Sequence, residues 1–498
     1  SSFVLLAFVI IYFIKTMVSF LYYYWNASFT SRMVAKLSKN LLTIYLLRPF
    51  EFHLKKNSAK LVRNTFSEIG TVVGAGIHPI MTIVVEILVV FGISVILFLV
   101  NPILTTVISI TLSMLAMTIF FGIRPFLYRW GKMREKADGK RIEYITQGLG
   151  GVKEILIHAK EKVFLKKFSE VNDISAQSTM KFSAFQNLPR LLIELVLILG
   201  FSMYCWLFII PANSQETDFV FIGVFIVAIL RILPSINKIL TAVQLMKYGL
   251  PYVEVLYQDF KEKNDHHKAA ASDQKFNFDR LIDINNICYS YEQNNIILNN
   301  LSFQINKGDK ISIIGESGAG KSTLVNILLG LLRPSSGEIK VDEMNIYDDL
   351  KGWQSQLGYV SQDIYLLDDT ILNNIALWVD NKDIDMMKVN ESLKLAALDG
   401  LIENLPNGLQ TIIGENGVRF SGGERQRLGI ARALYSKPSV LILDEITSAL
   451  DVETEKKVMD SIYSLDSNIT IILITHKASS SYGCNKVLSV KNGAIKIG

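Results

Sequence analysis

The chain has few cysteines and little excess charge. Its three cysteines, Cys205, Cys288 and Cys484, lie far apart in 498 residues. Their spacing matches neither a metal-binding motif nor a disulfide framework, which indicates a reducing compartment. The formal net charge of +5 is small for this length and predicts no nucleic-acid partner. No secretory signal is recognisable, because the chain opens in the apolar run Phe3–Ile14 without a charged region before it.

Hydrophobic residues are abundant. They make up 50% of the chain, the mean hydropathy is +0.31, and the excess is concentrated before about residue 245. Five runs are apolar enough to cross a bilayer, which takes roughly 20 residues as a helix. The predicted spans are Phe3–Tyr24, Gly74–Val100, Pro102–Ile123, Leu191–Ile210 and Phe219–Leu240. Asn101-Pro102 predicts a tight turn between the second and the third.

Two long polar segments, at about residues 26–71 and 124–190, separate these spans. Both are rich in Lys and Arg, whereas the short turn at 211–218 carries two acidic residues and no cation. Because cationic segments stay on the cytoplasmic side, we expect both long segments to face the cytoplasm. Their length and pattern predict helices that continue from the spans well beyond the membrane.

A polar stretch marks the boundary between two different sequence patterns. Residues 261–275 (KEKNDHHKAAASDQK) have no apolar period, as is typical of a linker. Beyond them strands alternate with helices, which predicts an α/β domain. The predicted division is a transmembrane domain at 1–258, a linker at 259–275 and an α/β domain at 276–498.

The α/β domain contains a phosphate-binding loop. It follows the strand-like run Ile311–Ile314 and precedes the helical pattern Leu324–Leu332, the context that such a loop requires. The glycines let backbone N–H groups close around phosphate oxygens, and the helix N-terminus adds partial positive charge. Lys321 can reach the β- and γ-phosphates, and Ser322 offers a hydroxyl to Mg²⁺. The residues predicted to bind the nucleoside triphosphate here are Gly315, Ser317, Gly318, Gly320, Lys321, Ser322 and Thr323.

A second motif ends a buried strand. The apolar run Val440–Leu443 is followed by Asp444 and Glu445. Beside a phosphate loop, Asp444 is placed to hold Mg²⁺ directly or through water, and Glu445 can polarise an attacking water. An ordinary acidic pair at a strand end is the alternative, and it would be preferred if the phosphate loop were absent.

Four further segments occur in an order typical of one family. Gln362 ends the run YVSQ, residues 420–424 read FSGGE, residues 448–451 read SALD, and His476 follows the apolar run 471–475. With the loop and the acidic pair, they make the chain resemble the ATP-binding cassette (ABC) family. The C-terminal motifs are specific, whereas the N-terminal likeness is one of topology.

The resemblance implies a fold class and an activity. The expected fold is an α-helical transmembrane domain of the six-helix exporter type, followed by an α/β P-loop ATPase domain. Five spans are apparent, so the first helix is expected to be missing before Phe3. The expected activity is ATP hydrolysis coupled to transport, with ATP and Mg²⁺ as cofactors.

The resemblance also assigns roles to single residues. Tyr291 would stack on adenine, with an ordinary strand tyrosine as the alternative. Glu445 looks like the general base, His476 like the γ-phosphate sensor, and Gln362 like the residue that links Mg²⁺ and the attacking water to the membrane domain.

The run 420–424 looks like the signature loop, which contacts the γ-phosphate of ATP held by the other subunit. Two glycines allow close approach of the backbone to a phosphate. Phe420 and Glu424 depart from the commonest pattern, which has Leu and Gln. The remaining residues assigned to the nucleotide are Ser421, Gly422, Gly423 and Asp451.

One cassette per chain implies that two chains pair. The partner would be a second copy or a paralogous half-transporter in the bacterial inner membrane, with the ATPase domain in the cytoplasm. Leu46–Leu54 and Ala159–Phe164 are expected to be short coupling helices. A membrane-anchored regulatory ATPase that moves no solute is the alternative from another class, and intact Glu445 and His476 argue against it.

Charged residues within the predicted spans are candidates for function, because charge at membrane depth is costly. They are Lys15, Glu86, Arg190, Glu194 and Arg231. Arg190 and Glu194, four residues apart, could simply pair, and Lys15 could snorkel to an interface. Arg231 lies mid-span, and its alternatives are a cavity-facing cation or a structural ion pair with Glu86.

Two segments of the spans suggest the substrate. Within the family, residues 231–235 (RILPS) and 189–194 look most similar to lipid-linked oligosaccharide flippases of protein glycosylation. Arg231, Arg190 and Lys15 would then meet the pyrophosphate of a polyprenyl-linked glycan. Export of lipid A, a peptide or a drug remains an alternative.

Overall fold

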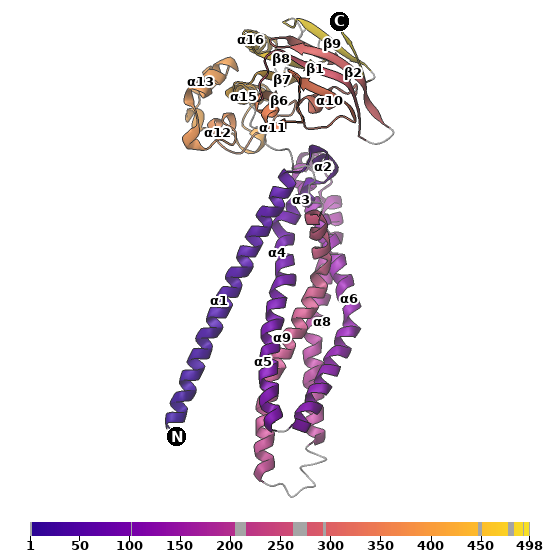
Figure 1. The fold of residues 1–498 in the computed structure, drawn as a ribbon, viewed down its shortest axis with the longest axis vertical. Helices are drawn as coiled ribbons and strands as arrows, with labels where there is room; N and C mark the ends of the chain where they lie inside the picture. Colours follow the sequence, from indigo (N-terminus) through magenta and orange to yellow (C-terminus); the bar gives the residue numbers. More distant parts are fainter. Residues whose placement is uncertain are drawn as a thin grey trace. The chain divides into compact units, whose positions relative to one another are not determined.

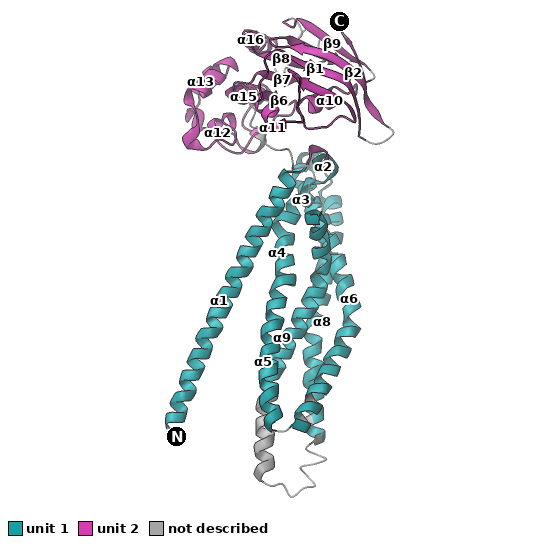
Figure 2. Ribbon diagram, viewed as in Figure 1, with its two compact units in different colours: residues 1–48, 52–264 teal, residues 49–51, 265–498 magenta. Residues whose placement is uncertain are grey.

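The computed structural model describes residues 2–100, 102–204, 216–261, 276–291, 295–446, 451–476, 483–491 and 493–497. The chain divides into two compact units (Figure 2). The first consists of residues 1–48 and 52–264, and the second of residues 49–51 and 265–498. The predicted order, a helical part followed by an α/β part, is confirmed.

In the described residues, the first unit is built mainly from long helices (Figure 1). These are α1 (Ser2–Leu46), α5 (His78–Val100), α6 (Pro102–Gly150), α8 (Glu161–Tyr204) and α9 (Glu216–Lys261). With a rise of 1.5 Å per residue, α1, α6 and α8 each reach about 65–75 Å, more than twice the bilayer core. The prediction of helices that continue beyond the membrane is therefore confirmed.

Four helical stretches among the described residues are long and apolar enough to cross a membrane. They are Ser2–Leu46, Ser58–Val100, Thr105–Gly150 and Glu161–Gly200. The fifth predicted span, Phe219–Leu240, belongs to α9, whose side chains before Leu230 lie outside the described residues. Residues 205–210, at the end of the fourth predicted span, also lie outside them.

Short elements connect the long helices. They are α2 (Phe50–Lys55), α3 (Ser58–Arg63), α4 (Ile69–Val72), α7 (Val152–Ile157) and the π-helical turns Asn64–Glu68 and Val73–Ile77. The short helix α2 thus overlaps the C-terminal part of the predicted range Leu46–Leu54. The predicted range Ala159–Phe164 is wrong, because the short helix α7 ends at Ile157 and Ala159 takes the left-handed conformation (φ 48°). The long helix α8 begins at Glu161. Helix α6 ends at Gly150, and Gly151 is the N-cap residue of α7.

A buried polar network joins the parts of the first unit that lie away from the predicted spans. Arg63 pairs with Glu68 (3.2 Å) on the adjoining π-helical turn and with Glu135 (3.1 Å) on α6. Tyr45 of α1 donates a hydrogen bond to Asp259 of α9 (2.6 Å), and Asn64, which accepts from Arg63 (3.5 Å), donates to the same carboxylate (2.8 Å). Removing one member of such a buried pair typically costs about 3–5 kcal/mol, so the network fixes α1, α3, α6 and α9 to one another.

The second unit contains two sheets. The antiparallel sheet has the order β2-β1-β4-β5, and the other sheet has the order β10-β9-β3-β8-β7-β6. The strands are β1 (Leu281–Ser290), β2 (Ile296–Asn306), β3 (Lys310–Gly315), β4 (Ser336–Val341), β5 (Met344–Asn345), β6 (Leu357–Val360), β7 (Val440–Asp444), β8 (Thr470–Thr475), β9 (Lys486–Lys491) and β10 (Ala494–Ile497). Strands β7 and β8 are buried along their whole length, as their apolar sequences predict for central parallel strands.

Helices flank the sheets. They are α10 (Lys321–Leu328), α11 (Leu350–Ser355), α12 (Ile371–Ile375), α13 (Met386–Leu395), α14 (Asp399–Glu403), α15 (Gly422–Tyr435) and α16 (Val452–Tyr463). Strand β8 pairs in parallel with both β3 and β7. The carboxyl ends of these three strands therefore meet at one edge of the sheet, and each is followed by a predicted site segment.

Candidate active site

The phosphate loop connects β3 to α10. Gly318 and Gly320 take the left-handed backbone conformation (φ 80° and 100°), which favours glycine. A Cβ on Gly320 would also lie 2.8 Å from a methyl group of Leu298. The Lys321 ammonium donates to the carbonyl oxygens of Gly315 (2.7 Å) and Glu316 (3.0 Å). The lysine is 6% exposed, and this burial lowers its pKa against the opposing effect of two nearby carboxylates.

The acidic pair ends β7. Asp444 is 8% exposed, and burial together with the neighbouring Glu445 raises the pKa of its carboxyl above the ordinary value. Glu445 takes the left-handed conformation (φ 51°), which costs a non-glycine residue about 1–2 kcal/mol. Its N–H donates to the carbonyl oxygen of Ile474 (3.0 Å). Backbone strain at this position is typical of functional sites.

The three residues predicted to act in hydrolysis lie in contact. One carboxylate oxygen of Glu445 lies 2.5 Å from His476 Nε2, and the other accepts a hydrogen bond from Gln362 Nε2 (2.9 Å). His476 Nδ1 lies 3.0 Å from the carbonyl oxygen of Gly315 and 3.3 Å from Lys321 Nζ. A continuous chain of polar contacts thus runs from the phosphate loop to Gln362.

Tyr291 lies close to the same loop. Its hydroxyl is 3.5 Å from Thr323 Oγ1 on α10, and its ring meets Tyr289 edge-on, with ring centres 5.0 Å apart. The tyrosine is 39% exposed. Ser317 and Ser322 are exposed as well.

The predicted signature loop begins α15. Ser421 is the N-cap residue, and its N–H (2.7 Å) and Oγ (2.9 Å) both donate to the Glu424 carboxylate. Gly422 and Gly423 form the first turn. No hydrogen bond of the described residues joins this segment to the phosphate loop. Asp451 caps α16 through the Thr454 N–H (3.0 Å), and Ser448–Leu450 lie outside the described residues.

The predicted metal ligands offer oxygen donors. Ser322 has an exposed hydroxyl, and Asp444 has a buried carboxylate that a cation would stabilise. Gln362 uses its nitrogen for Glu445, so its amide oxygen stays available. Mg²⁺ prefers such oxygen ligands, and the donor set therefore fits this ion. Among the described residues there is no cluster of three His, Cys, Asp or Glu side chains for another metal.

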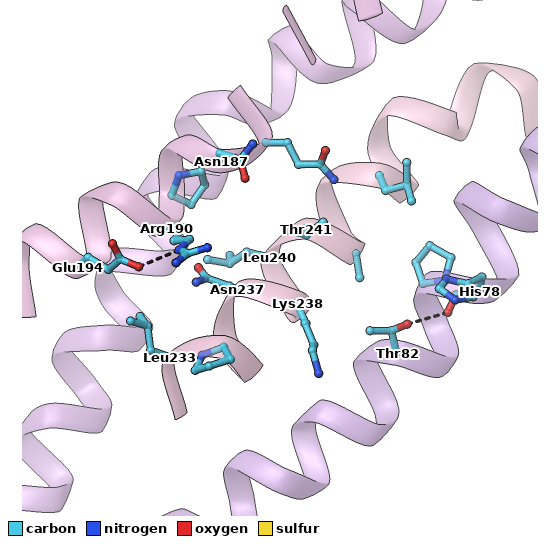
Figure 3. A pocket seen from close by; sticks show the side chains of 16 residues that line it. His78, Thr82, Asn187, Arg190, Glu194, Leu233, Asn237, Lys238, Leu240 and Thr241 are labelled. Carbon is cyan, nitrogen blue, oxygen red and sulfur yellow. Dashed lines mark hydrogen bonds and ion pairs between the residues drawn. The ribbon is translucent and has the colours of Figure 1, made fainter. Parts of the chain in front are cut away.

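In the first unit, a cavity of about 450 Å³ lies between α5, α8 and α9 (Figure 3). Arg190 lines it and pairs with Glu194 (2.8 Å). Lys15 and Arg231 are exposed and line neither this cavity nor the apolar one beside it. The Lys15 ammonium lies 5.0 Å from the centre of the Tyr12 ring.

The alternative ion pair between Arg231 and Glu86 is wrong. Glu86 Oε1 lies 2.5 Å from Lys238 Nζ. Arg231 is seven residues earlier on α9, about 10 Å along the helix axis, which places it two turns away from this contact. Sequence reasoning missed Lys238, although this cation falls in the last turn of the predicted span Phe219–Leu240.

Comparison with known proteins agrees with this geometry. The family model for the ABC transporter transmembrane region matches residues 1–233, and the family model for the ABC transporter matches residues 298–448. The ATP-dependent lipid A-core flippase of Photobacterium profundum is 30% identical over 482 residues, covering 94% of this chain and 79% of that protein. The flippase of the same description from Mannheimia succiniciproducens is 28% identical over 506 residues, covering 98% and 83%.

A solved structure has the same fold. It is a bacterial Atm1-family ABC exporter with ATP bound, with a TM-score of 0.82 and 22% identity, covering 95% of this chain and 82% of that one. The chain belongs to the ABC transporter family. It is an exporter-type half-transporter, a multi-pass membrane protein with one ATPase domain that drives transport by ATP hydrolysis. The narrower prediction of oligosaccharide-lipid flipping stays a prediction, because the relatives are named for lipid A-core.

Proposed function

We propose that two such chains pair and move a phosphorylated glycolipid across the bacterial inner membrane, with the ATPase domains in the cytoplasm. The main support is that relatives matching 94% and 98% of this chain are named ATP-dependent lipid A-core flippases. Lipid A-core is therefore the first candidate substrate. The partner is a second copy or a paralogous half-transporter, since one chain carries one cassette.

A polyprenyl-pyrophosphate-linked oligosaccharide is the second candidate. It shares a hydrocarbon part, phosphate and sugars with lipid A-core. Its pyrophosphate would meet Arg190, which lines the cavity between α5, α8 and α9 and pairs with Glu194. Arg231 and Lys15 would be further contacts, although neither lines this cavity. Guanidinium binds phosphate through a planar fork that an ammonium cannot reproduce.

In the proposed hydrolysis, Glu445 takes a proton from the attacking water. His476 contacts the γ-phosphate, and Gln362 links the metal site to Glu445. The two short contacts to the Glu445 carboxylate support this division of roles, because they orient the base from both sides. Lys321 neutralises phosphate charge. Mg²⁺, bound by Ser322, Asp444 and Gln362, would supply further positive charge to the phosphates.

Tyr291 would stack on adenine, and the signature segment Ser421–Gly423 would complete the partner's site. We further propose the domain boundaries 1–258, 259–275 and 276–498 for the transmembrane domain, the linker and the ATP-binding cassette.

Transport by the purified full chain in proteoliposomes tests the proposal. One set of vesicles contains fluorescent lipid A-core, and a matched set contains a fluorescent polyprenyl-diphosphate oligosaccharide. We expect ATP-dependent movement of lipid A-core between leaflets, and none with Glu445→Gln. Movement of the oligosaccharide lipid alone would favour the second candidate. ATP hydrolysis with movement of neither would favour either another exported substrate, such as a peptide or a drug, or a regulatory ATPase.

A further inference from the structure

Glu424 adds a negative charge to the predicted signature loop. Gln, which is commonest at this position, has a side chain of the same length and no charge. The proposed hydrolysis uses Ser421, three residues earlier, to complete the partner's site and leaves Glu424 without a role. The carboxylate therefore lies within the segment that the partner's γ-phosphate would approach, where a second anion opposes the first.

The Glu424 carboxylate accepts hydrogen bonds from both donors of Ser421. Its Oε2 atom accepts from the Ser421 N–H (2.7 Å) and from Ser421 Oγ (2.9 Å). Ser421 Oγ in turn accepts from the Glu424 N–H (3.3 Å), which completes a capping box at the start of α15. A serine hydroxyl has a single hydrogen, so Ser421 Oγ cannot donate to this carboxylate and to a phosphate at the same time.

A phosphate needs the groups that the carboxylate already uses. An ionised γ-phosphate accepts hydrogen bonds, so Ser421 has to donate to it. The N-terminus of a helix also attracts negative charge, and Glu424, in the first turn of α15, already supplies that charge. Hydrogen bonds to a charged acceptor are roughly twice as strong as those between neutral groups. Glu424 therefore competes with the phosphate more strongly than a glutamine would.

Exposure allows the exchange of one acceptor for the other. Ser421 is exposed, whereas Glu424 is half-buried behind it. A phosphate can therefore reach the hydroxyl without displacing the backbone of α15, and rotation of the hydroxyl hydrogen is enough to change its acceptor. The Ser421 N–H can stay with Glu424 during this exchange, so the helix keeps part of its cap.

We propose that Glu424 is a positioning residue for ATP hydrolysis, which holds the Ser421 hydroxyl until the partner's γ-phosphate displaces the Glu424 carboxylate from it. This inference rests on the proposed function, because Ser421 of one chain must meet ATP that is bound by the other. The phosphate keeps its contact with Ser421 from binding to the transition state, so the competition affects KM for ATP and not kcat. The carboxylate thus sets the ATP concentration at which the composite site closes.

Steady-state ATPase kinetics of the full chain in phosphatidylcholine nanodiscs test this role. We expect Glu424→Gln to lower KM for ATP about tenfold, as for the difference between a charged and a neutral hydrogen bond. The value of kcat should stay within about threefold of the parent. Because Gln also serves in a capping box, the melting temperature should not change. An unchanged or higher KM would overturn the proposal.

Two further variants separate competition from a merely structural role of the cap. Glu424→Ala should lower the melting temperature, because the cap is lost, and should still lower KM, because Ser421 is released; a higher KM would overturn the proposal. If Glu424→Gln does not fold, Glu424→Ala is judged by the same KM criterion. In a Ser421→Ala background, Glu424→Gln should change KM by less than about threefold, since the two residues act together. The full gain in that background would overturn the competition for the hydroxyl.

The matched control is Asp385→Asn, which removes a negative charge from another helix N-terminus of the same unit. Asp385 caps α13 through the Met387 N–H (3.0 Å), and Asn is an equally good cap. No nucleotide contact is assigned to this residue, so KM and kcat should match those of the parent. A KM that falls as far as in Glu424→Gln would reduce the effect to one of overall charge and overturn the proposal.

Pairs of unlike chains distinguish failure of this role from failure of the proposed function. One chain carries Lys321→Ala, the other keeps its phosphate loop, and each pair is purified through two affinity tags. Glu424→Gln should lower KM when it lies on the Lys321→Ala chain, which lends its signature loop to the active site, and not when it lies on the other chain. The reverse pattern would reject the composite site, which belongs to the proposed function. No gain on either chain would reject the role of Glu424 alone.

Discussion

Replacing Glu445 by Gln should separate nucleotide binding from hydrolysis. The Gln362 amide nitrogen, 2.9 Å from one carboxylate oxygen, can still donate to the amide oxygen of the new side chain. His476 Nε2, 2.5 Å from the other oxygen, can accept from the new NH₂ group. The imidazole then keeps its proton on Nδ1, which lies 3.0 Å from the Gly315 carbonyl oxygen. Both contacts therefore survive the substitution.

The magnitudes follow from those contacts. Hydrogen bonds to a charged group contribute about 1.5–3 kcal/mol, against about 0.5–1.5 kcal/mol between neutral groups. Replacing these two charged hydrogen bonds by neutral ones, beside a solvent-accessible imidazole, should lower the free energy of unfolding by at most about 1–2 kcal/mol. The loss of a general base should reduce turnover by about 10²–10⁴-fold.

Phosphate release and equilibrium binding of a fluorescent ATP analogue, both on the reconstituted chain, check the two parts. We expect binding within about threefold of the parent, which is less than 1 kcal/mol. Turnover within a few-fold of the parent would refute Glu445 as the base. Loss of ATP binding or of folding would refute the reasoning about its contacts.

Four further outcomes can be measured. Lys321→Ala should weaken ATP binding itself by at least tenfold, because the ammonium faces the phosphates before reaction; unchanged affinity in the binding assay contradicts this. Mixing Lys321→Ala chains with Gly422→Asp chains should restore part of the ATPase activity, since both lesions fall in one composite site, and an absence of recovery rejects composite sites. Arg231→Ala should reduce lipid movement while ATPase activity and thermal stability persist; full movement would exclude a substrate role. Gly139→Ala should lower the melting temperature, because its Cβ would overlap the Arg63 guanidinium, which must then shift within the buried polar network. Gly122→Ala, with open space around it, should not, and equal melting temperatures would contradict the packing.

The ATP site could be predicted because the residues that bind the nucleotide occur in short local motifs. The phosphate loop needs glycines and a lysine at fixed spacing, and the structure places Gly318 and Gly320 in left-handed conformations there. The contact between Glu445 and His476 is different. It depends on the parallel pairing of β7 with β8. This long-range pairing is not specified by the number of residues between the two strands.

The membrane half was less predictable for a related reason. Apolar runs predict which segments are helices, but they do not predict the axial offset between two packed helices. This offset determines that Glu86 of α5 pairs with Lys238 of α9 and not with Arg231, which lies two turns earlier on α9. Likewise, the resemblance to the family placed a short helix at Ala159–Phe164, whereas α6 ends at Gly150 and the short helix α7 ends at Ile157.

The buried polar network has a consequence for motion. Because Arg63, Glu135, Tyr45 and Asp259 tie four helices together, those helix ends should travel as one rigid body during transport. The π-helical turn Val73–Ile77, with two glycines and open space around both, lies between that body and α5. Rotation at this turn would act as a lever: about 10° would displace the far end of the 23-residue helix α5 by roughly 6 Å. Spin-label distances within the network should stay constant through the ATP cycle, while those from the network to Val100 change.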